Sequence, residues 1–189
     1  MFICMVRHGE TDWNAAKKLQ GQTDIPLNDR GRQQAREAGL YLKNQSWDIV
    51  ITSPLSRAME TANIICEQLG PIQQEVMPAF AERYFGKAEG LTKEERYRLY
   101  PASADLGEED WEQFKTRIMN GLSQIKDKYN TQRVLLIAHG AVINAILSTL
   151  TNGKIGTGKT RLMNACLSNL QCENEQWHVQ NYNETSHLS

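Results

Sequence analysis

The chain has 189 residues, 40% of them hydrophobic and 23% charged, so it is long enough for one sizeable core and short for two. A formal net charge of -1 argues against a nucleic-acid-binding surface. No apolar run approaches the roughly 18 residues of a membrane span, and the four cysteines lack paired metal-ligand spacing. We therefore expect one domain over residues 1–189, soluble, cytoplasmic and with reduced thiols, that binds neither nucleic acid nor membrane.

The first predicted element is the apolar run Phe2–Val6, and the polar segment Arg7–Asn14 follows it at once. Such a run is typical of a parallel strand covered on both faces, and ligands of open α/β sheets collect beyond the carboxyl ends of these strands. There the Arg7 guanidinium matches phosphate or carboxylate oxygens, and a ring nitrogen of His8 can act as nucleophile or base. Gly9 lets the backbone come close to a ligand. Because an imidazole beside an arginine resists protonation, we expect neutral His8.

A second apolar run, Trp47–Ile51, also leads into polar residues. Ser53 is a natural N-cap for the helix that follows, with Pro54 at the first helical position. Arg57 then falls in the first turn of this helix, where the helix dipole and the side chain both favour an anion.

The intervening segments complete an alternation of helices with strands. Capping residues and the spacing of apolar residues predict helices over about 29–43 (capped by Asn28), 54–69, 92–100, 108–129 and 141–150, a short strand over 74–77, and a closing antiparallel hairpin over 165–179. This alternation predicts an α/β fold with a mostly parallel central sheet. Residues 78–110 have the mixed polarity of a functional loop, so we expect a lid-like excursion there and a loose tail over about 184–189.

The histidine at the end of the first strand has a counterpart near the other end of the chain. A single histidine is more often a core or capping residue than a catalytic one. Here, however, the apolar run Val134–Ala138 leads into His139 and Gly140, the same order as in the first strand. Two histidines, together with Arg7 and Arg57, therefore meet at the ends of three strands. These residues predict a pocket for a dianion such as phosphate.

Five blocks of residues carry a family resemblance. They are Arg7-His8-Gly9-Glu10-Thr11-x-Trp13-Asn14, Gln20-Gly21-x-x-Asp24-x-Pro26-Leu27-x-x-x-Gly31-x-x-Gln34-Ala35, Ser53-Pro54-Leu55-x-Arg57-Ala58-x-x-Thr61, Glu82-x-x-Phe85-Gly86-x-x-Glu89-Gly90 and His139-Gly140. In this order they resemble the histidine phosphatase superfamily, in its branch similar to cofactor-dependent phosphoglycerate mutase. The resemblance runs from residue 2 to Leu188, and it implies a three-layer α/β/α sandwich of the phosphoglycerate mutase-like type.

The resemblance also implies a mechanism, namely hydrolysis of small phosphomonoesters through a phosphohistidine on His8, with Glu82 as proton donor. Glu10 and Glu89 are rival carboxylates for the role of acid. Neither a metal nor a cofactor is implied, because two arginines supply the stabilising charge. The implied catalytic residues are His8, Arg7, Arg57, Glu82 and His139, and the implied phosphate-binding residues are Arg7, Gly9, Asn14, Gln20, Gly21, Arg57, His139 and Gly140.

Two other functions stay open at this point. A phosphoglycerate mutase would use the same pocket and return the phosphoryl group to a bound phosphoglycerate, although family mutases carry an added lid segment that this chain lacks. An inactive phospho-ligand or protein-binding module is the second alternative, and the presence of all five catalytic side chains argues against it. The physiological substrate is open, and so is the oligomeric state, for which a homodimer is one option. Lys87 and Ala88 replace a tryptophan that many relatives carry before the Glu-Gly pair, which predicts different lid packing.

The segment Gly153–Thr160 matches the nucleotide-binding P-loop pattern letter for letter. A P-loop follows a strand and opens a helix, whereas this segment follows a helical pattern and precedes a strand pattern. We therefore expect a flexible basic loop, from which Lys154 or Lys159 could reach an acidic substrate, and no ATP site.

Overall fold

The computed structural model describes all 189 residues, and its centre is one six-stranded sheet with the strand order β3-β2-β4-β1-β5-β6. The strands are β1 (Phe2–Arg7), β2 (Ile49–Thr52), β3 (Gln73–Val76), β4 (Arg133–Ala138), β5 (Leu167–Glu173) and β6 (Gln176–Glu184). The first four run parallel to one another, while β5 is antiparallel to β1 and β6 is antiparallel to β5. The predicted mostly parallel sheet with a closing hairpin is thus confirmed.

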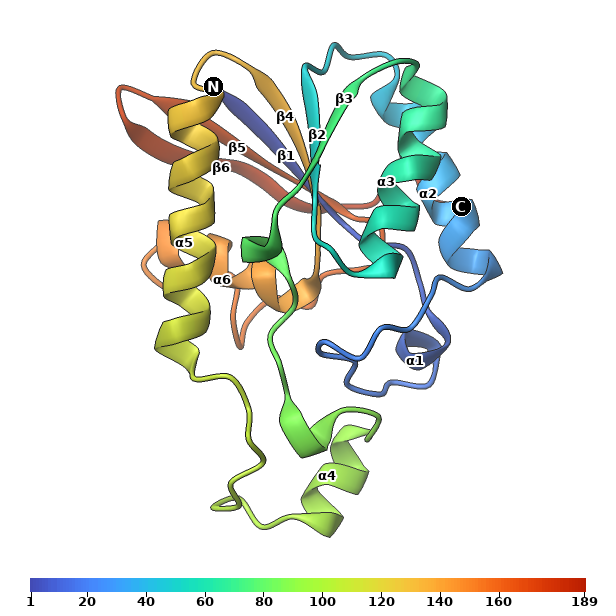
Figure 1. The fold of residues 1–189 in the computed structure, drawn as a ribbon, viewed down its shortest axis with the longest axis vertical. Helices are drawn as coiled ribbons and strands as arrows, with labels where there is room; N and C mark the ends of the chain where they lie inside the picture. The colour runs from blue at the N-terminus through green and yellow to red at the C-terminus, as the bar shows by residue number, and fades with distance from the viewer.

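Helices cover both faces of the sheet (Figure 1). One layer holds α2 (Asp29–Leu42) and α3 (Ser56–Leu69), which pack against each other, and the opposite layer holds α5 (Trp111–Lys128) and α6 (Gly140–Leu150). The side chains of β1 alternate between the two layers. Ile3 and Met5 join the core beneath α5 and α6, whereas Cys4 and Val6 join the core beneath α2 and α3. The three-layer α/β/α sandwich is therefore confirmed.

The helix boundaries follow from their caps. Asn28 accepts a hydrogen bond from the Gly31 amide and caps α2, as predicted. Helix α5 begins at residue 111 and not at about 108, because the Asp110 side chain accepts from the amides of residues 112 and 113. The helix after β2 also begins later than predicted. Its N-cap is Leu55 and not Ser53, and the carboxylate of Asp24 accepts from the backbone and hydroxyl of Ser56 instead.

The excursion between β3 and α5 extends away from the body of the molecule beyond the carboxyl ends of the parallel strands (Figure 1). It contains the short helices η1 (Pro78–Phe80), η2 (Gly86–Ala88) and α4 (Lys93–Leu99). The predicted capping box opens α4, with Thr92 and Glu95 each bonding the other's backbone amide. Helix α1 (Asp12–Ala15) lies at the same end of the sheet.

Two segments that were expected to be loops make contacts within the protein. In the last residues, the Ser189 hydroxyl donates to Glu37 of α2, and His187 bonds the carbonyl oxygen of Ala165. The P-loop-like segment follows α6 and precedes β5, as expected, and its lysines are not among the residues that line the cavities at the strand ends. The Lys159 ammonium donates to the Gly153 carbonyl oxygen within the loop itself. No helix of the chain has the length and apolar character needed to cross a membrane.

Candidate active site

The carboxyl ends of the four parallel strands bring the predicted residues to one place. Arg7 and His8 end β1, Arg57 follows β2, Glu82 follows β3, and His139 follows β4. A cavity of about 210 Å³ lies between them. Its lining includes seven of the predicted residues, namely Arg7, His8, Asn14, Gln20, Gly21, Arg57 and Glu82. His139, Gly9 and Gly140 are not among the lining residues, although the His139 ring lies against that of His8.

His8 is held with one ring nitrogen free. Its Nδ1 lies 2.7 Å from the carbonyl oxygen of Gly9, which accepts only, so Nδ1 carries the proton and Nε2 keeps its lone pair. The side chain is 2% exposed. Burial lowers the pKa of His8 well below its ordinary value, and the charges of Arg57 and Arg7 lower it further. The predicted neutral imidazole is thus supported by its surroundings.

The two arginines are anchored through backbone carbonyl groups and not through carboxylates. Arg57 is fully buried and donates to the carbonyl oxygens of Gly21, at 2.7 Å, and Thr23, at 3.1 Å. Arg7 donates to the carbonyl oxygen of Leu162. The Nε atoms of both arginines are buried and have no partner in the protein. Two guanidinium groups without a carboxylate partner leave a net positive charge beside His8.

His139 lies against His8, with ring centroids 5.2 Å apart. Its Nε2 lies 2.7 Å from the Ser53 hydroxyl, which also accepts from the amide of Leu55. The hydroxyl has one proton and a second lone pair, so it can donate to Nε2 or accept from an Nε2–H, while Nδ1 of His139 is buried without a partner in the protein. Burial, followed by the charges of Arg57 and His8, lowers the pKa of His139 well below its ordinary value. His139 is thus a neutral imidazole beside His8.

Glu82 is the buried carboxyl group of the cavity, with 8% of the residue exposed. Its two oxygens accept from the backbone amides of Arg83, at 2.9 Å, and Ala141, at 3.1 Å. Burial raises the pKa of Glu82, and this effect outweighs the opposing effects of the two amides and of Arg57 and Arg7. A carboxyl group in this setting holds its proton to a higher pH than an exposed one.

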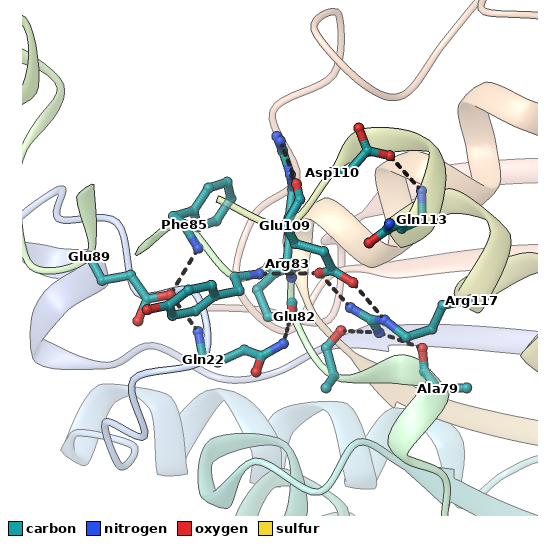
Figure 2. A network of polar contacts seen from close by, with 12 residues as sticks. Gln22, Ala79, Glu82, Arg83, Phe85, Glu89, Glu109, Asp110, Gln113 and Arg117 are labelled. Carbon is teal, nitrogen blue, oxygen red and sulfur yellow. Dashed lines mark hydrogen bonds and ion pairs between the residues drawn. The ribbon is translucent and has the colours of Figure 1, made fainter. Parts of the chain in front are cut away.

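The segment that carries Glu82 is fixed by the network in Figure 2. The Arg117 guanidinium donates to the carbonyl oxygens of Ala79 and Ala81, and it forms a two-point ion pair with Glu109, with its shortest distance at 2.8 Å. On the opposite side, the side-chain amide of Gln22 donates to the backbone carbonyl oxygen of Glu82. The backbone on both sides of Glu82 is therefore held by side chains from α5 and from the loop after α1.

The rival carboxylates are engaged elsewhere. Glu89 accepts from the backbone amides of Gln22, Thr23 and Phe85 and so ties the loop after α1 to the lid excursion. Its carboxylate fills the space beside Gly21, where a Cβ atom would lie 1.9 Å from a Glu89 oxygen and φ is +56°. Glu10 accepts from the Asn28 side chain. Neither residue lines the cavity, which leaves Glu82 as its only carboxyl group.

Three supporting residues escaped the sequence analysis. Asn164 donates from Nδ2 to the carbonyl oxygens of His8 and Gly9 and to Oδ1 of Asn14, at 3.0–3.3 Å. Thr61 accepts from the Gly9 amide, and Ser53 orients His139. Thr61 and Ser53 lie within the motif blocks that carry the family resemblance, so those motifs could have identified them. Asn164 lies in an irregular loop before β5, and no local pattern marks it.

A larger hollow of about 500 Å³ lies between β3 and the C-terminal end of α5. Its polar groups bond one another, since Glu75 accepts from Lys128 and from the Tyr129 hydroxyl. No nucleophile, arginine pair or histidine pair lines it. The smaller cavity at the strand ends is therefore the candidate active site.

Comparison with known proteins agrees with this assignment of the fold. The family model described as "Histidine phosphatase superfamily (branch 1)" matches residues 3–185. The chain is 49% identical to "Uncharacterized phosphatase PhoE" of Bacillus subtilis, covering 99% of this chain and 96% of the relative. It is 32% identical to a "Metal-independent phosphoserine phosphatase" of Arabidopsis thaliana, covering 99% and 83%, and the matches also include proteins named as probable phosphoglycerate mutases.

Among solved structures, Bacillus stearothermophilus YhfR superposes with a TM-score of 0.91 at 24% identity, covering 100% of this chain and 99% of that one. At this identity the superposition shows a shared fold. The family match spans nearly the whole chain and includes every strand end that borders the cavity. The chain belongs to branch 1 of the histidine phosphatase superfamily.

Proposed function

We propose that this chain is a phosphatase that hydrolyses small phosphomonoesters through a covalent phosphohistidine on His8. One observation carries the proposal. The Nδ1–H of His8 is bound to the Gly9 carbonyl oxygen, so the lone pair of Nε2 is free in a cavity lined by two arginines. A neutral imidazole in this tautomer is a nucleophile, and the arginines attract the phosphate dianion that it attacks.

In the first step, Nε2 of His8 attacks the phosphorus atom and the ester P–O bond breaks. The Nε atoms of Arg7 and Arg57 are buried donors without protein partners, and they bind the phosphate oxygens as charge develops. In this proposal the ring proton of His139 lies on Nδ1, which also has no partner, and Nδ1 donates to the same phosphate. Glu82, with its raised pKa, gives its proton to the departing alkoxide. Asn14, whose Oδ1 is held by Asn164, adds its Nδ2 as a further donor.

In the second step, the Glu82 carboxylate takes a proton from water, and the water oxygen attacks the phosphohistidine. The P–N bond breaks, His8 recovers its lone pair, and inorganic phosphate leaves. Glu82 regains the proton that it lost in the first step, so one residue is both acid and base. In a phosphoglycerate mutase, by contrast, the hydroxyl of a bound phosphoglycerate would take the place of water.

A cytoplasmic location is part of this proposal. All four cysteines are free thiols, and Cys4, Cys66 and Cys166 are buried. Buried unpaired thiols favour a reducing compartment.

The test is a screen of phosphomonoesters with and without chelator, scored for free phosphate and for isomerised phosphoglycerate. We expect free phosphate, and an acid-labile, base-stable phosphoryl group on His8 after brief mixing with substrate. His8→Ala should abolish turnover and keep the fold, because His8 lies at a strand end and fills no part of the apolar core. His178→Ala, at an exposed position of β6, is the matched control and should keep full activity. Label on a serine or cysteine would overturn the mechanism, and isomerisation without net hydrolysis would favour the mutase.

A further inference from the structure

A second cavity of about 270 Å³ adjoins the active site and shares Arg7, Asn14 and Lys18 with it. The other polar side chains that line it are Lys17, Arg161 and Asn164. Four of these residues are cationic and none is acidic. The cavity is therefore a concentration of positive charge at one wall of the phosphate site.

Three of the cations that line the second cavity have no partner in the protein. Lys17, Lys18 and Arg161 form no ion pair and no side-chain hydrogen bond, although eight ion pairs occur elsewhere in the chain. The pKa of Glu95 is lowered by backbone and side-chain bonds to Thr92 and, to a lesser degree, by the charge of Lys18, but Glu95 lines neither cavity. Cations brought together without counter-charges repel one another, so their convergence favours an anion between them.

Backbone geometry places these residues at the wall of the active site. Lys17 has φ = +57°, a left-handed conformation that is costly for a lysine, and Lys18 pairs with Thr92 at the edge of the lid excursion. Arg161 precedes Leu162, whose carbonyl oxygen binds Arg7, and the charge of Arg161 adds to the effect of burial in lowering the pKa of Arg7. Asn164 and Asn14 are joined directly by a hydrogen bond. A group in this cavity therefore lies next to a phosphate in the active site.

We propose that the second cavity binds a second anionic group of the substrate, so that the preferred substrates are phosphomonoesters with a carboxylate or another phosphate a few bonds from the ester. This inference rests on the proposed phosphatase function. Arg161, Lys17 and Lys18 hold the second anion, and Arg7 lies between the two anionic groups. Compounds with one phosphate and a neutral tail fit the active site but leave these cations without a partner.

The binding test uses non-hydrolysable compounds, so it does not depend on turnover. In calorimetric titrations of the full chain, phosphonoacetate should bind at least about tenfold more tightly than ethylphosphonate, which has an ethyl tail of similar size. Arg161→Ala should remove most of this advantage and leave ethylphosphonate unchanged. Lys159→Ala is the matched control, since Lys159 belongs to the same basic loop but lines neither cavity. Methylenediphosphonate, compared with phosphonoacetate, shows whether the cavity prefers a phosphate or a carboxylate.

Equal affinities of the wild type for phosphonoacetate and ethylphosphonate would overturn this inference. So would an Arg161→Ala variant that weakens both compounds equally. Turnover separates this inference from the proposed function. We expect kcat/KM for phosphoglycolate to exceed that for ethyl phosphate by a similar factor, with Arg161→Ala acting mainly on KM. If neither ester is hydrolysed but the binding preference holds, the phosphatase proposal fails and the anion site stands; if both are hydrolysed equally well, the anion site fails.

Discussion

Burial favours the neutral forms of three ionisable side chains in the active site. The pKa values of His8 and His139 are lowered and that of Glu82 is raised, and in each case burial is the largest cause. The nucleophile therefore keeps its lone pair to a lower pH, and the acid keeps its proton to a higher pH, than the same groups would in water. Both conditions depend on the low dielectric constant of the site, which disfavours the charged form of each group.

The double role of Glu82 leads to a prediction that depends on the leaving group. With an alkyl phosphate, the alkoxide needs the proton, so Glu82→Gln should lower kcat by roughly 10²- to 10⁴-fold. With p-nitrophenyl phosphate, the leaving group departs unaided, and only the second step lacks its base. Rapid-mixing experiments should then show a burst of nitrophenol as phosphoenzyme accumulates. An equal loss for both substrates without a burst would mean that Glu82 only orders the loop.

Asn164 acts as a donor to three acceptors, and this predicts an unusual sensitivity to an isosteric change. In Asn164→Asp, a carboxylate would face the carbonyl oxygens of His8 and Gly9 and the amide oxygen of Asn14 with no hydrogen to donate. We expect a loss of about 2 kcal/mol in the free energy of unfolding, measured by urea titration at constant m-value. Asn183→Asp is the control, because the Asn183 side chain accepts from the Met163 amide and an aspartate can do the same. Similar losses in both variants would contradict this account.

At the scale of elements, the loop after β1 crosses the first turn of α2 at a distance that only glycine permits. A Cβ atom on Gly31 would lie 2.1 Å from the Glu10 carbonyl oxygen, and one on Gly9 would lie 2.3 Å from the Gly31 carbonyl oxygen. These contacts are with backbone, so no side chain can move aside. The loop that carries His8 is therefore positioned by α2 as well as by β1.

This crossing predicts that Gly31→Ala destabilises the protein by about 1–3 kcal/mol and lowers activity by displacing the loop at Gly9. The matched control is Gly140→Ala in the first turn of α6, where the new Cβ would meet only the Arg7 guanidinium, at ordinary distances of 3.5 Å from Nε and 3.8 Å from Cζ. Its free energy of unfolding should be unchanged or higher by up to about 1 kcal/mol. Denaturant titration measures both variants, and a tolerated Gly31→Ala would show that the loop is free to shift.

For the whole molecule, the two buried histidines link stability to pH. Their pKa values are lowered on folding, so below the ordinary value of 6.5 the unfolded chain binds more protons than the folded one. Their contribution to stability is present above pH 6.5 and is lost as the pH falls. We expect His139→Gln to reduce the dependence of the unfolding free energy on pH between 6.5 and 5 by up to about 1.4 kcal/mol per pH unit.

Urea titrations at several pH values provide this measurement. Because His139→Gln also loses the bond to Ser53, only the slope against pH tests the linkage, and the absolute stability does not. His178→Gln, at an exposed position, should keep the slope of the wild type. A His139→Gln slope equal to that of the wild type would mean that this histidine is protonated alike in the folded and unfolded chains.

The sequence by itself determined the features that depend on neighbouring residues. An apolar run followed directly by Arg7-His8-Gly9 places those residues at a strand end, because chain connectivity allows no other position. The caps at Asn28 and Thr92 are satisfied within three residues, and both were predicted correctly. The convergence of His8, Arg57 and His139 also follows, since the carboxyl ends of parallel strands lie at one edge of a sheet, whereas Glu82 was implied by the family resemblance.

The tertiary structure alone decided the contacts between segments that are distant in the sequence. Asn164 reaches His8 because β5 pairs with β1, and Ser53 reaches His139 because β2 pairs with β4. The tertiary structure also brings Arg161 to the cavity that Lys17 and Lys18 line, and it places the end of the chain against α2. Hydrophobic periodicity predicts whether a segment is a strand or a helix, but it determines neither the order of the strands in the sheet nor the direction that a loop takes. These contacts therefore depend on how the packed layers bring separate segments together, which no local pattern encodes.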